Sequence, residues 1–232
     1  MGGLRAASCP KGAHCPHTPA PRIIEMISRR GKAMSKLTEM HTPVFWAEGH
    51  PGSLSAEEWK VEIGGLVEKP VALTYAEILA LPKSVADARL TSVSGWSVRG
   101  KWGGVRLSDL LPLANPKTEA KHVQFISYRE TYTTCIPLEI ALQERTLLAY
   151  EFDGEPLEPT YGGPIRIFCP YLWGYKSAKC VVGITLEARS IPGYWEVRGY
   201  PDHGQIKPRK LLDVNSQRMR RIRGGEVIEF VD

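Results

Sequence analysis

Residues 161–179 read YGGPIRIFCPYLWGYKSAK, a stretch that combines two glycine turns with closely spaced cations. The Gly-Gly-Pro run at 162–164 predicts a turn, and Arg166 follows it on a short apolar strand. Gly174 predicts a second turn, which leads into a run of polar donors: Lys176, Ser177 and Lys179. Such a loop suits a phosphate or another oxyanion, because fixed donors and nearby cations both stabilise negative charge.

Spacing alone leaves two interpretations of this loop open, an anion-binding site and an ordinary lysine-bearing surface loop. Motifs of several other enzyme classes are absent from the sequence. It has no G-x-S-x-G elbow around Ser92 and Ser94, no P-loop and no H-x-x-x-H zinc pair. It also has no G-x-G-x-x-G and no regular βαβ rhythm, which excludes a Rossmann dinucleotide-binding domain.

Short alternating segments on both sides of this loop predict strands separated by turns. Strands are predicted over 59–65, 88–93, 122–128, 147–157, 164–170, 179–188 and 226–231. Short helices are predicted over 73–82, 105–113 and 137–142. The first helix begins with a capping box formed by Thr74 and Glu77. This order of elements predicts an α+β domain that is rich in β structure, with short helices between the strands.

Length and composition favour one large domain behind a leader. The chain has 232 residues, of which 43% are hydrophobic and 24% charged, as is ordinary for a globular domain. Residues 1–40 lack a periodic pattern and predict a flexible leader, and residues 41–232 predict one domain. The leader holds four residues of metal-binding type whose spacing matches no zinc finger: Cys9, His14, Cys15 and His17.

The net charge of +5 favours anionic partners only weakly. Basic residues gather over 207–223, but no nucleic-acid-binding module accompanies them, so we expect a solvated surface and no nucleic acid partner. We find no stretch apolar enough for a membrane span and no export signal. Five cysteines at irregular spacing fit a reducing compartment, and we therefore expect a cytoplasmic protein.

Five longer segments carry a family resemblance. They are WKVEIGGLVEKPVALTYAEILALP (59–82), RLTSVSGWSVRGKWGGVRLSDLL (89–111), FISYRETYTTCIPLEIAL (125–142), LLAYEFDGEPLEPTYGGPIRIFCPYLWGYKSAKCVVGITL (147–186) and GYWEVRGY (193–200). In this order they resemble the molybdopterin-binding domain of the sulfite oxidase family, including its small bacterial members. The resemblance implies the β-rich α+β fold of that family and a molybdopterin cofactor.

The resemblance also implies the residues of the site. In that family a cysteine of the motif x-C-V-x-G-W-S binds molybdenum, and here Ser92 stands in its place. Ser92 is therefore the implied metal ligand, and Ser92 and Arg166 are the implied catalytic residues. Tyr161 departs from the His or Asn that the family usually has there. The implied cofactor-binding residues are His50, Ser127, Tyr161, Gly162, Arg166, Gly174, Tyr175, Lys176, Ser177 and Lys179.

Three interpretations of Ser92 stay open. The serine binds the metal as an alkoxide, or it does not bind and the pterin is retained with little redox activity, or it is an engineered or erroneous replacement. A hydroxyl is a harder ligand than a thiolate and loses its proton much less readily. Cys135 is not an obvious substitute, and Cys169 and Cys180 lie on apolar strands typical of a core.

The reaction implied by the resemblance is oxygen-atom transfer on a small sulfur-containing or oxyanion substrate. Arg166, Lys176 and Arg99 are candidates to attract an oxyanion, although Arg99 is also typical of surface charge. Because the sequence has no haem attachment motif, we expect a separate electron-transfer partner. The alternative is a catalytically impaired member that binds the pterin or a partner without redox turnover.

Overall fold

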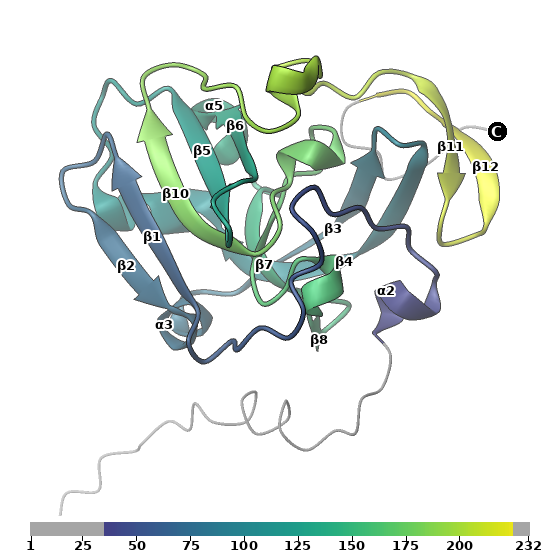
Figure 1. Cartoon of the computed structure of the whole chain (residues 1–232), viewed down its shortest axis with the longest axis horizontal. Helices are drawn as coiled ribbons and strands as arrows, with labels where there is room; N and C mark the ends of the chain where they lie inside the picture. The colour runs from purple at the N-terminus through teal and green to yellow at the C-terminus, as the bar shows by residue number, and fades with distance from the viewer. Residues whose placement is uncertain (1–34, 225–232) are drawn as a thin grey trace, which may run out of the picture. The chain divides into compact units, whose positions relative to one another are not determined.

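The computed structural model describes residues 35–224, which contain two β-sheets (Figure 1). The strands are β1 (Lys60–Gly65), β2 (Val71–Thr74), β3 (Ser84–Ser92), β4 (Trp96–Arg106), β5 (His122–Ser127), β6 (Thr133–Pro137), β7 (Leu147–Phe152), β8 (Glu155–Pro156), β9 (Arg166–Phe168), β10 (Val181–Glu187), β11 (Arg209–Asp213) and β12 (Arg218–Ile222). The α-helices are α2 (Lys36–Glu39), α3 (Tyr75–Ala80), α4 (Leu107–Leu110) and α5 (Leu138–Ala141), and short 3-10 helices lie at Leu111–Ala114, Pro159–Tyr161, Gly174–Lys176 and Glu196–Arg198.

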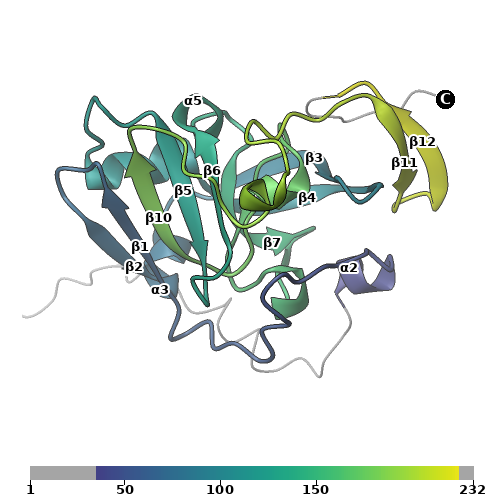
Figure 2. The same cartoon turned by 45° about the horizontal axis from the view of Figure 1, so that its top comes forward.

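The first sheet has the strand order β2-β1-β10-β5-β6. The second has the order β12-β11-β4-β7-β8, and β3 also pairs with β4 while β9 pairs with β7. Figure 2 shows the first sheet on the left and the β11–β12 hairpin on the right. The predicted β-rich α+β fold is therefore confirmed, and none of the described helices is long and apolar enough to cross a membrane.

Local sequence signals explain the elements that were predicted correctly. In β1, buried residues alternate with exposed ones, as the pattern from Trp59 onward predicts. Helix α3 begins with the predicted capping box, in which the Thr74 hydroxyl accepts from the backbone N–H of Glu77 and the Glu77 carboxylate accepts from that of Thr74. The Trp59 indole donates to the carbonyl of Val181 at 2.8 Å and so ties the start of β1 to β10.

Five strands were not predicted: β2, β4, β6, β11 and β12. Strand β4 escapes detection because glycines interrupt its pattern of apolar residues. The structure gives these glycines a packing role, because the ring of Phe152 covers Gly100 and the backbone of Leu148 approaches Gly104 too closely for a side chain. The hairpin strands β11 and β12 are dominated by charged residues, a composition that favours a solvated surface over a strand.

The two ends of the described chain qualify the predicted domain limits. Residues 35–40 fall inside the predicted leader, yet they contain helix α2 and bury the side chain of Leu37. The strand predicted over 226–231 and the four metal-type residues of the leader lie outside the described residues.

A cluster of aromatic side chains supports the region where the site lies. Trp102 of β4 is fully buried, stacked on Phe168 at 4.5 Å and edge-on to Phe152 at 4.9 Å between ring centroids. Such pairs contribute about 0.5–1.5 kcal/mol each beyond the area that they bury. The cluster therefore gives β4, β7 and β9 a rigid junction beneath the loops that follow.

Candidate functional site

A cavity of about 280 Å³ is lined by residues from several segments that are distant in sequence. Its walls include the coil 42–48, the turn 92–94 after β3, side chains of β4, and residues of the loop 174–179. The coil runs from α2 toward β1 in Figure 1. The cavity thus brings the quoted cationic loop together with the turn that carries Ser92.

Ser92 lies at the end of β3, half-buried in the cavity wall. It pairs with Trp96 across a tight turn, in which Gly95 has a φ of +96° and donates its N–H to the Ser92 carbonyl at 3.2 Å. A positive φ of this kind favours glycine. The Ser92 hydroxyl accepts a hydrogen bond from the backbone N–H of Ser94 at 3.1 Å, which directs its oxygen toward the turn.

Arg166 supplies a buried cation to the cavity wall. Its side chain is 3% exposed, and its guanidinium donates to the carbonyls of Tyr161 at 2.6 Å and Ser177 at 3.2 Å. Burial lowers the pKa of Arg166 to about 10, because the charged form loses its hydration. The guanidinium remains charged at neutral pH, and no described carboxylate lies within 4.0 Å of it.

Lys179 supplies a second cation to the same wall. Its ammonium group donates to the carbonyl of Phe45 at 2.6 Å and lies 4.4 Å from the centroid of the Trp46 indole. Burial, together with the charge of Arg166, lowers the pKa of Lys179 to about 7. Within the described chain it too lacks a carboxylate within ion-pair distance. The wall therefore holds the charged Arg166 and an amine that is charged below about pH 7, both without a paired carboxylate, and a bound anion would favour the charged form of each.

The other predicted residues divide into two groups. Ser127, Tyr161, Gly174, Tyr175 and Ser177 line the cavity with Ser92, Arg166 and Lys179, whereas His50, Gly162 and Lys176 do not. Gly162 instead supports Lys179 from behind, with a φ of +99°. A Cβ atom there would lie 2.9 Å from the Cβ of Lys179.

Lys176 does not line the cavity and has polar partners within the protein. It is fully buried, and its ammonium group contacts the carboxylate of Glu196 at 2.5 Å and the carbonyl of Cys135 at 2.9 Å. His50 is exposed and hydrogen-bonds to the hydroxyl of Thr160 at 3.0 Å, with its ring 5.9 Å from that of Trp46. Neither side chain lines the cavity, but each lies next to residues that do: His50 contacts Trp46, and Lys176 contacts Glu196 beside Trp195.

Arg99 and the cysteines lie outside the cavity lining. Arg99 forms an exposed pair with Asp87 at 2.9 Å, so the expectation of surface charge is confirmed for it. Cys135, Cys169 and Cys180 are free and buried, and burial raises the pKa of each thiol. None of these three cysteines reaches the cavity, so Ser92 has no described thiol beside it.

Several cavity residues were not identified from the sequence. Glu48 is the one carboxylate among the described lining residues, and it accepts hydrogen bonds from the Ser127 hydroxyl and from the backbone N–H of Tyr132. Phe45 and Trp195 face each other with ring centroids 5.6 Å apart. The coil that carries Phe45 and Glu48 lacks periodicity, so only its aromatic and acidic residues themselves could have drawn attention to it.

The polar groups of the wall fit a cofactor of the expected kind. The described chain has seven buried polar side-chain atoms without a hydrogen-bond partner, and three of them belong to residues that line the cavity: Thr42, Trp46 and Trp102. Buried donors normally have a partner, so these groups suit a polar ligand. Two cations, hydroxyls and aromatic rings match the phosphate and the flat ring system of a molybdopterin.

The same residues offer little to a free metal ion. Among residues 35–224, no group of three or more His, Cys, Asp or Glu side chains could hold a metal. A metal at this site would therefore have to arrive with ligands of its own, and Ser92 would add one oxygen.

Comparison with known proteins agrees with this geometry. The protein family described as "Oxidoreductase molybdopterin binding domain" matches residues 47–195, which contain the whole first sheet, the second sheet without β11 and β12, and most of the cavity wall. An uncharacterized oxidoreductase of Bacillus subtilis, YuiH, is 38% identical over 163 residues, which cover 70% of this chain and 82% of that protein.

Two further similarities extend the comparison. The protein-methionine-sulfoxide reductase catalytic subunit MsrP of Campylobacter jejuni is 29% identical over 168 residues, which cover 66% of this chain and 57% of that protein. The chain thus spans little more than half the length of this relative. The crystal structure of the sulfane dehydrogenase SoxCD from Paracoccus pantotrophus matches 90% of this chain and 67% of its own, with a TM-score of 0.59 and 20% identity. At that identity the match supports the fold alone.

Proposed function

This chain belongs to the family of oxidoreductases that carry a molybdopterin-binding domain, and from that membership we propose that it is an oxygen-atom-transfer enzyme. Its substrate would be a small sulfur-containing compound or an oxyanion. The similarity to a protein-methionine-sulfoxide reductase supports a sulfoxide as the first substrate to test. A separate protein would supply or accept the electrons, and we propose a cytoplasmic location.

The observation that carries this proposal is the joint position of Ser92, Arg166 and Lys179 in one cavity wall. The three residues come from β3, β9 and the loop before β10, so only the folded sheets bring them together. When bound, the cofactor would supply a molybdenum centre that exchanges an oxygen atom and two electrons with the substrate.

The residues of the chain would bind and orient the participants. Arg166 and Lys179 would hold negative charge on the cofactor or on an oxyanion substrate, at a depth where charge attraction is little screened. The aromatic rings of Phe45 and Trp195 would keep water from the cavity mouth. The hydrogen-bonded pair of Glu48 and Ser127 could exchange protons with a substrate oxygen, because reduction of a sulfoxide consumes protons.

Ser92 supports a second candidate function. A serine oxygen is far more basic than a thiolate, and no cysteine of residues 35–224 lines the cavity. A chain that retained the cofactor without a thiolate ligand could bind the pterin or a partner without turnover. The two candidates differ in whether the native protein transfers oxygen.

The test uses the full chain from a molybdenum-replete host. Bound molybdenum is measured by mass spectrometry and the pterin by fluorescence, and turnover is assayed with methionine sulfoxide and with sulfite. Three variants are compared with the native protein: Ser92→Ala, Ser92→Cys and the control Ser94→Cys. Ser94 also lines the cavity, two residues from Ser92, so it controls for a thiol added at the wrong position.

Each result decides between the candidates. Turnover by the native protein that Ser92→Ala abolishes supports the enzyme with a serine ligand. The impaired alternative is supported if the native protein binds pterin without turnover, Ser92→Cys gains turnover, and Ser94→Cys does not. A pure, folded protein that contains neither molybdenum nor pterin would reject both.

A further inference from the structure

Strands β11 and β12 form a hairpin whose surface is strongly basic. Residues 207–223, called the basic hairpin here, contain seven lysines and arginines and one aspartate. Residues 35–206 contain 17 lysines and arginines against 20 aspartates and glutamates. The described chain therefore concentrates its positive charge in one hairpin, and the remainder is slightly acidic.

The outward face of the basic hairpin places like charges opposite each other. Lys210 of β11 pairs directly with Arg221 of β12, and both side chains are exposed. Like charges directly opposite on neighbouring strands destabilise a sheet. The next pair on this face is Leu212 and Met219, and Met219 is 53% exposed. The face thus combines repelling cations with an exposed apolar side chain, and neither feature helps the hairpin to fold.

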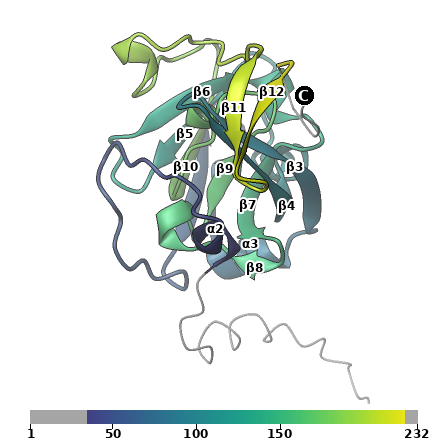
Figure 3. The ribbon, with the colours of Figure 1, turned by 90° about the vertical axis from the view of Figure 1, so that its right-hand side faces the viewer.

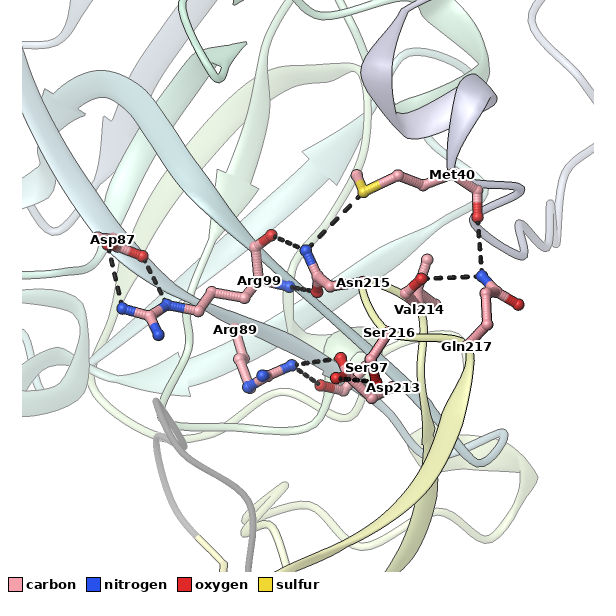
Figure 4. Close-up of polar contacts among 10 residues, drawn as sticks. All are labelled: Met40, Asp87, Arg89, Ser97, Arg99, Asp213, Val214, Asn215, Ser216 and Gln217. Atoms are coloured by element: carbon pink, nitrogen blue, oxygen red, sulfur yellow. Dashed lines mark hydrogen bonds and ion pairs between the residues drawn. The ribbon is translucent and has the colours of Figure 1, made fainter.

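The base of the hairpin is nevertheless held firmly to the second sheet. Asp213 forms a buried ion pair with Arg89 of β3 at 2.9 Å, and Arg89 also donates to the Ser97 hydroxyl. Figure 4 shows both contacts as dashed lines. The Asn215 side chain accepts from the backbone N–H of Arg99 and donates to its carbonyl, each at 2.7 Å. These contacts fix the cationic face relative to β3 and β4.

The basic hairpin is also joined to the cavity wall. β11 runs parallel to the start of β4, with Leu212 opposite Trp96. Figure 3 shows the β11–β12 hairpin from the side that faces away from the first sheet. Arg209 donates to the carbonyl of Val93 at 2.9 Å, and Val93 lies in the turn that follows Ser92. The buried side of the hairpin packs Leu211 and Ile222 against aromatic residues that include Tyr175 of the cavity wall. A molecule bound to the hairpin would therefore sit beside the proposed site.

We propose that the basic hairpin is the docking surface for an acidic electron-carrier protein, an inference that rests on the proposed function because oxygen-atom transfer needs a partner that supplies two electrons for substrate reduction or accepts two from substrate oxidation. Complementary charge would steer such a carrier to the hairpin and orient it toward the turn that carries Ser92. The mixed face favours a protein over other polyanions, because arginine and methionine are both enriched in protein interfaces.

The experiment measures binding of the full chain to a flavodoxin, a small acidic electron carrier, by surface plasmon resonance at low and high salt. The hairpin variant carries Lys210→Glu and Arg221→Glu. The control carries Lys69→Glu and Lys121→Glu, which make the same charge change at exposed positions beside strands of the first sheet. Anionic phosphatidylglycerol vesicles and duplex DNA are measured in parallel.

We expect salt-sensitive binding of flavodoxin that falls about tenfold or more in the hairpin variant and less than about twofold in the control. Three results would overturn the proposal: no binding of flavodoxin, an equal loss in both variants, or hairpin-dependent binding of the vesicles or DNA alone. The experiment uses the full chain because residues 225–232, which follow the basic hairpin in sequence, contain acidic residues that alter the net charge available to a partner; these residues lie outside the described part of the chain.

Turnover separates this inference from the proposed function. With dithionite as the reductant, the hairpin variant should reduce sulfoxide as fast as the native protein, whereas flavodoxin-driven turnover should fall with binding. If the native protein reduces sulfoxide with neither dithionite nor flavodoxin, the proposed function is rejected. The binding comparison still decides whether the hairpin docks an acidic carrier.

Discussion

The ammonium group of Lys176 lies 2.5 Å from a carboxylate oxygen of Glu196, and the two side chains are 0% and 3% exposed. The same carboxylate oxygen accepts from the hydroxyl of Thr134 at 2.8 Å. The pair joins the loop of the cationic motif to the segment that carries Trp195, so it holds two parts of the cavity wall together.

Removal of this lysine should cost much of the stability of the fold. In Lys176→Met, the Glu196 carboxylate remains buried without its partner, and we expect the free energy of unfolding to fall by about 3–5 kcal/mol. Urea unfolding would measure it. The double variant Lys176→Met with Glu196→Leu should recover part of the loss, while Lys69→Met, at an exposed site, should change stability by under about 0.5 kcal/mol. An equal loss in the single and double variants would contradict this account.

Lys179 should make stability depend on pH. Burial lowers the pKa of Lys179 to about 7 from its ordinary 10.5, so between these values the unfolded chain binds more protons than the folded one. The free energy of unfolding of the native protein should therefore rise from pH 7 to pH 10 relative to Lys179→Met. Urea titrations across this range test it, with Lys69→Met as the variant that should keep the rise. Parallel profiles for native protein and Lys179→Met would rule out the lowered pKa.

Gly162 should be sensitive to a methyl group because of Lys179. Gly162→Ala would strain a backbone with a φ of +99° and press on the Lys179 side chain, whereas Gly154→Ala meets similar strain at +84° with nothing within 4 Å. The strain costs about 1–2 kcal/mol in either variant. Thermal melting should show a clearly larger loss for Gly162→Ala, together with reduced pterin content. Equal melting temperatures would show that the contact with Lys179 is unimportant.

Two carboxylates on the second sheet offer a matched comparison. Asp213 pairs with Arg89, and their side chains are only 7–8% exposed. Asp87 pairs with Arg99, and these side chains are 39–46% exposed. Asp213→Asn should cost about 3 kcal/mol or more, because it removes the carboxylate charge that faces the buried guanidinium of Arg89. Asp87→Asn should cost under about 1 kcal/mol, since exposed pairs contribute little. Hydrogen exchange should increase in β11 and β3 for the first variant only. Unchanged exchange there would argue that the turn at 214–217 holds the hairpin without the ion pair.

The sequence predicted those parts of the fold in which local chemistry and tertiary packing agree. Strand β1 alternates and helix α3 has its capping box, so both could be recognised from a few residues. Strand β4 could not, because its glycines serve contacts with Phe152 and Leu148 from a distant part of the chain. The basic hairpin escaped for a similar reason: the buried residues that hold it, Leu211 and Ile222, are few among many charges.

The site followed the same division. The family resemblance implied Ser92, and the loop 161–179 together with that resemblance pointed to Arg166 and Lys179; the folded sheets bring the three residues into one wall. Spacing could not separate Lys176 from Lys179, although one is buried in an ion pair and the other faces the cavity. That difference depends on Glu196, which belongs to a later segment. Glu48 was missed because its coil has no pattern and gains its position only from contacts with β5 and β6.

The pairing of β11 with β4 has a consequence for how the protein is made. Arg209 and Val93 contact each other although they are 116 residues apart, and the cavity draws on residues from Leu37 to Tyr200. Contacts of such long range form late, because the intervening chain must first exist and close. The wall therefore cannot form until translation has delivered the chain through Tyr200, and its contact with the basic hairpin must wait for Arg209, so insertion of a pterin has to follow the synthesis of these segments.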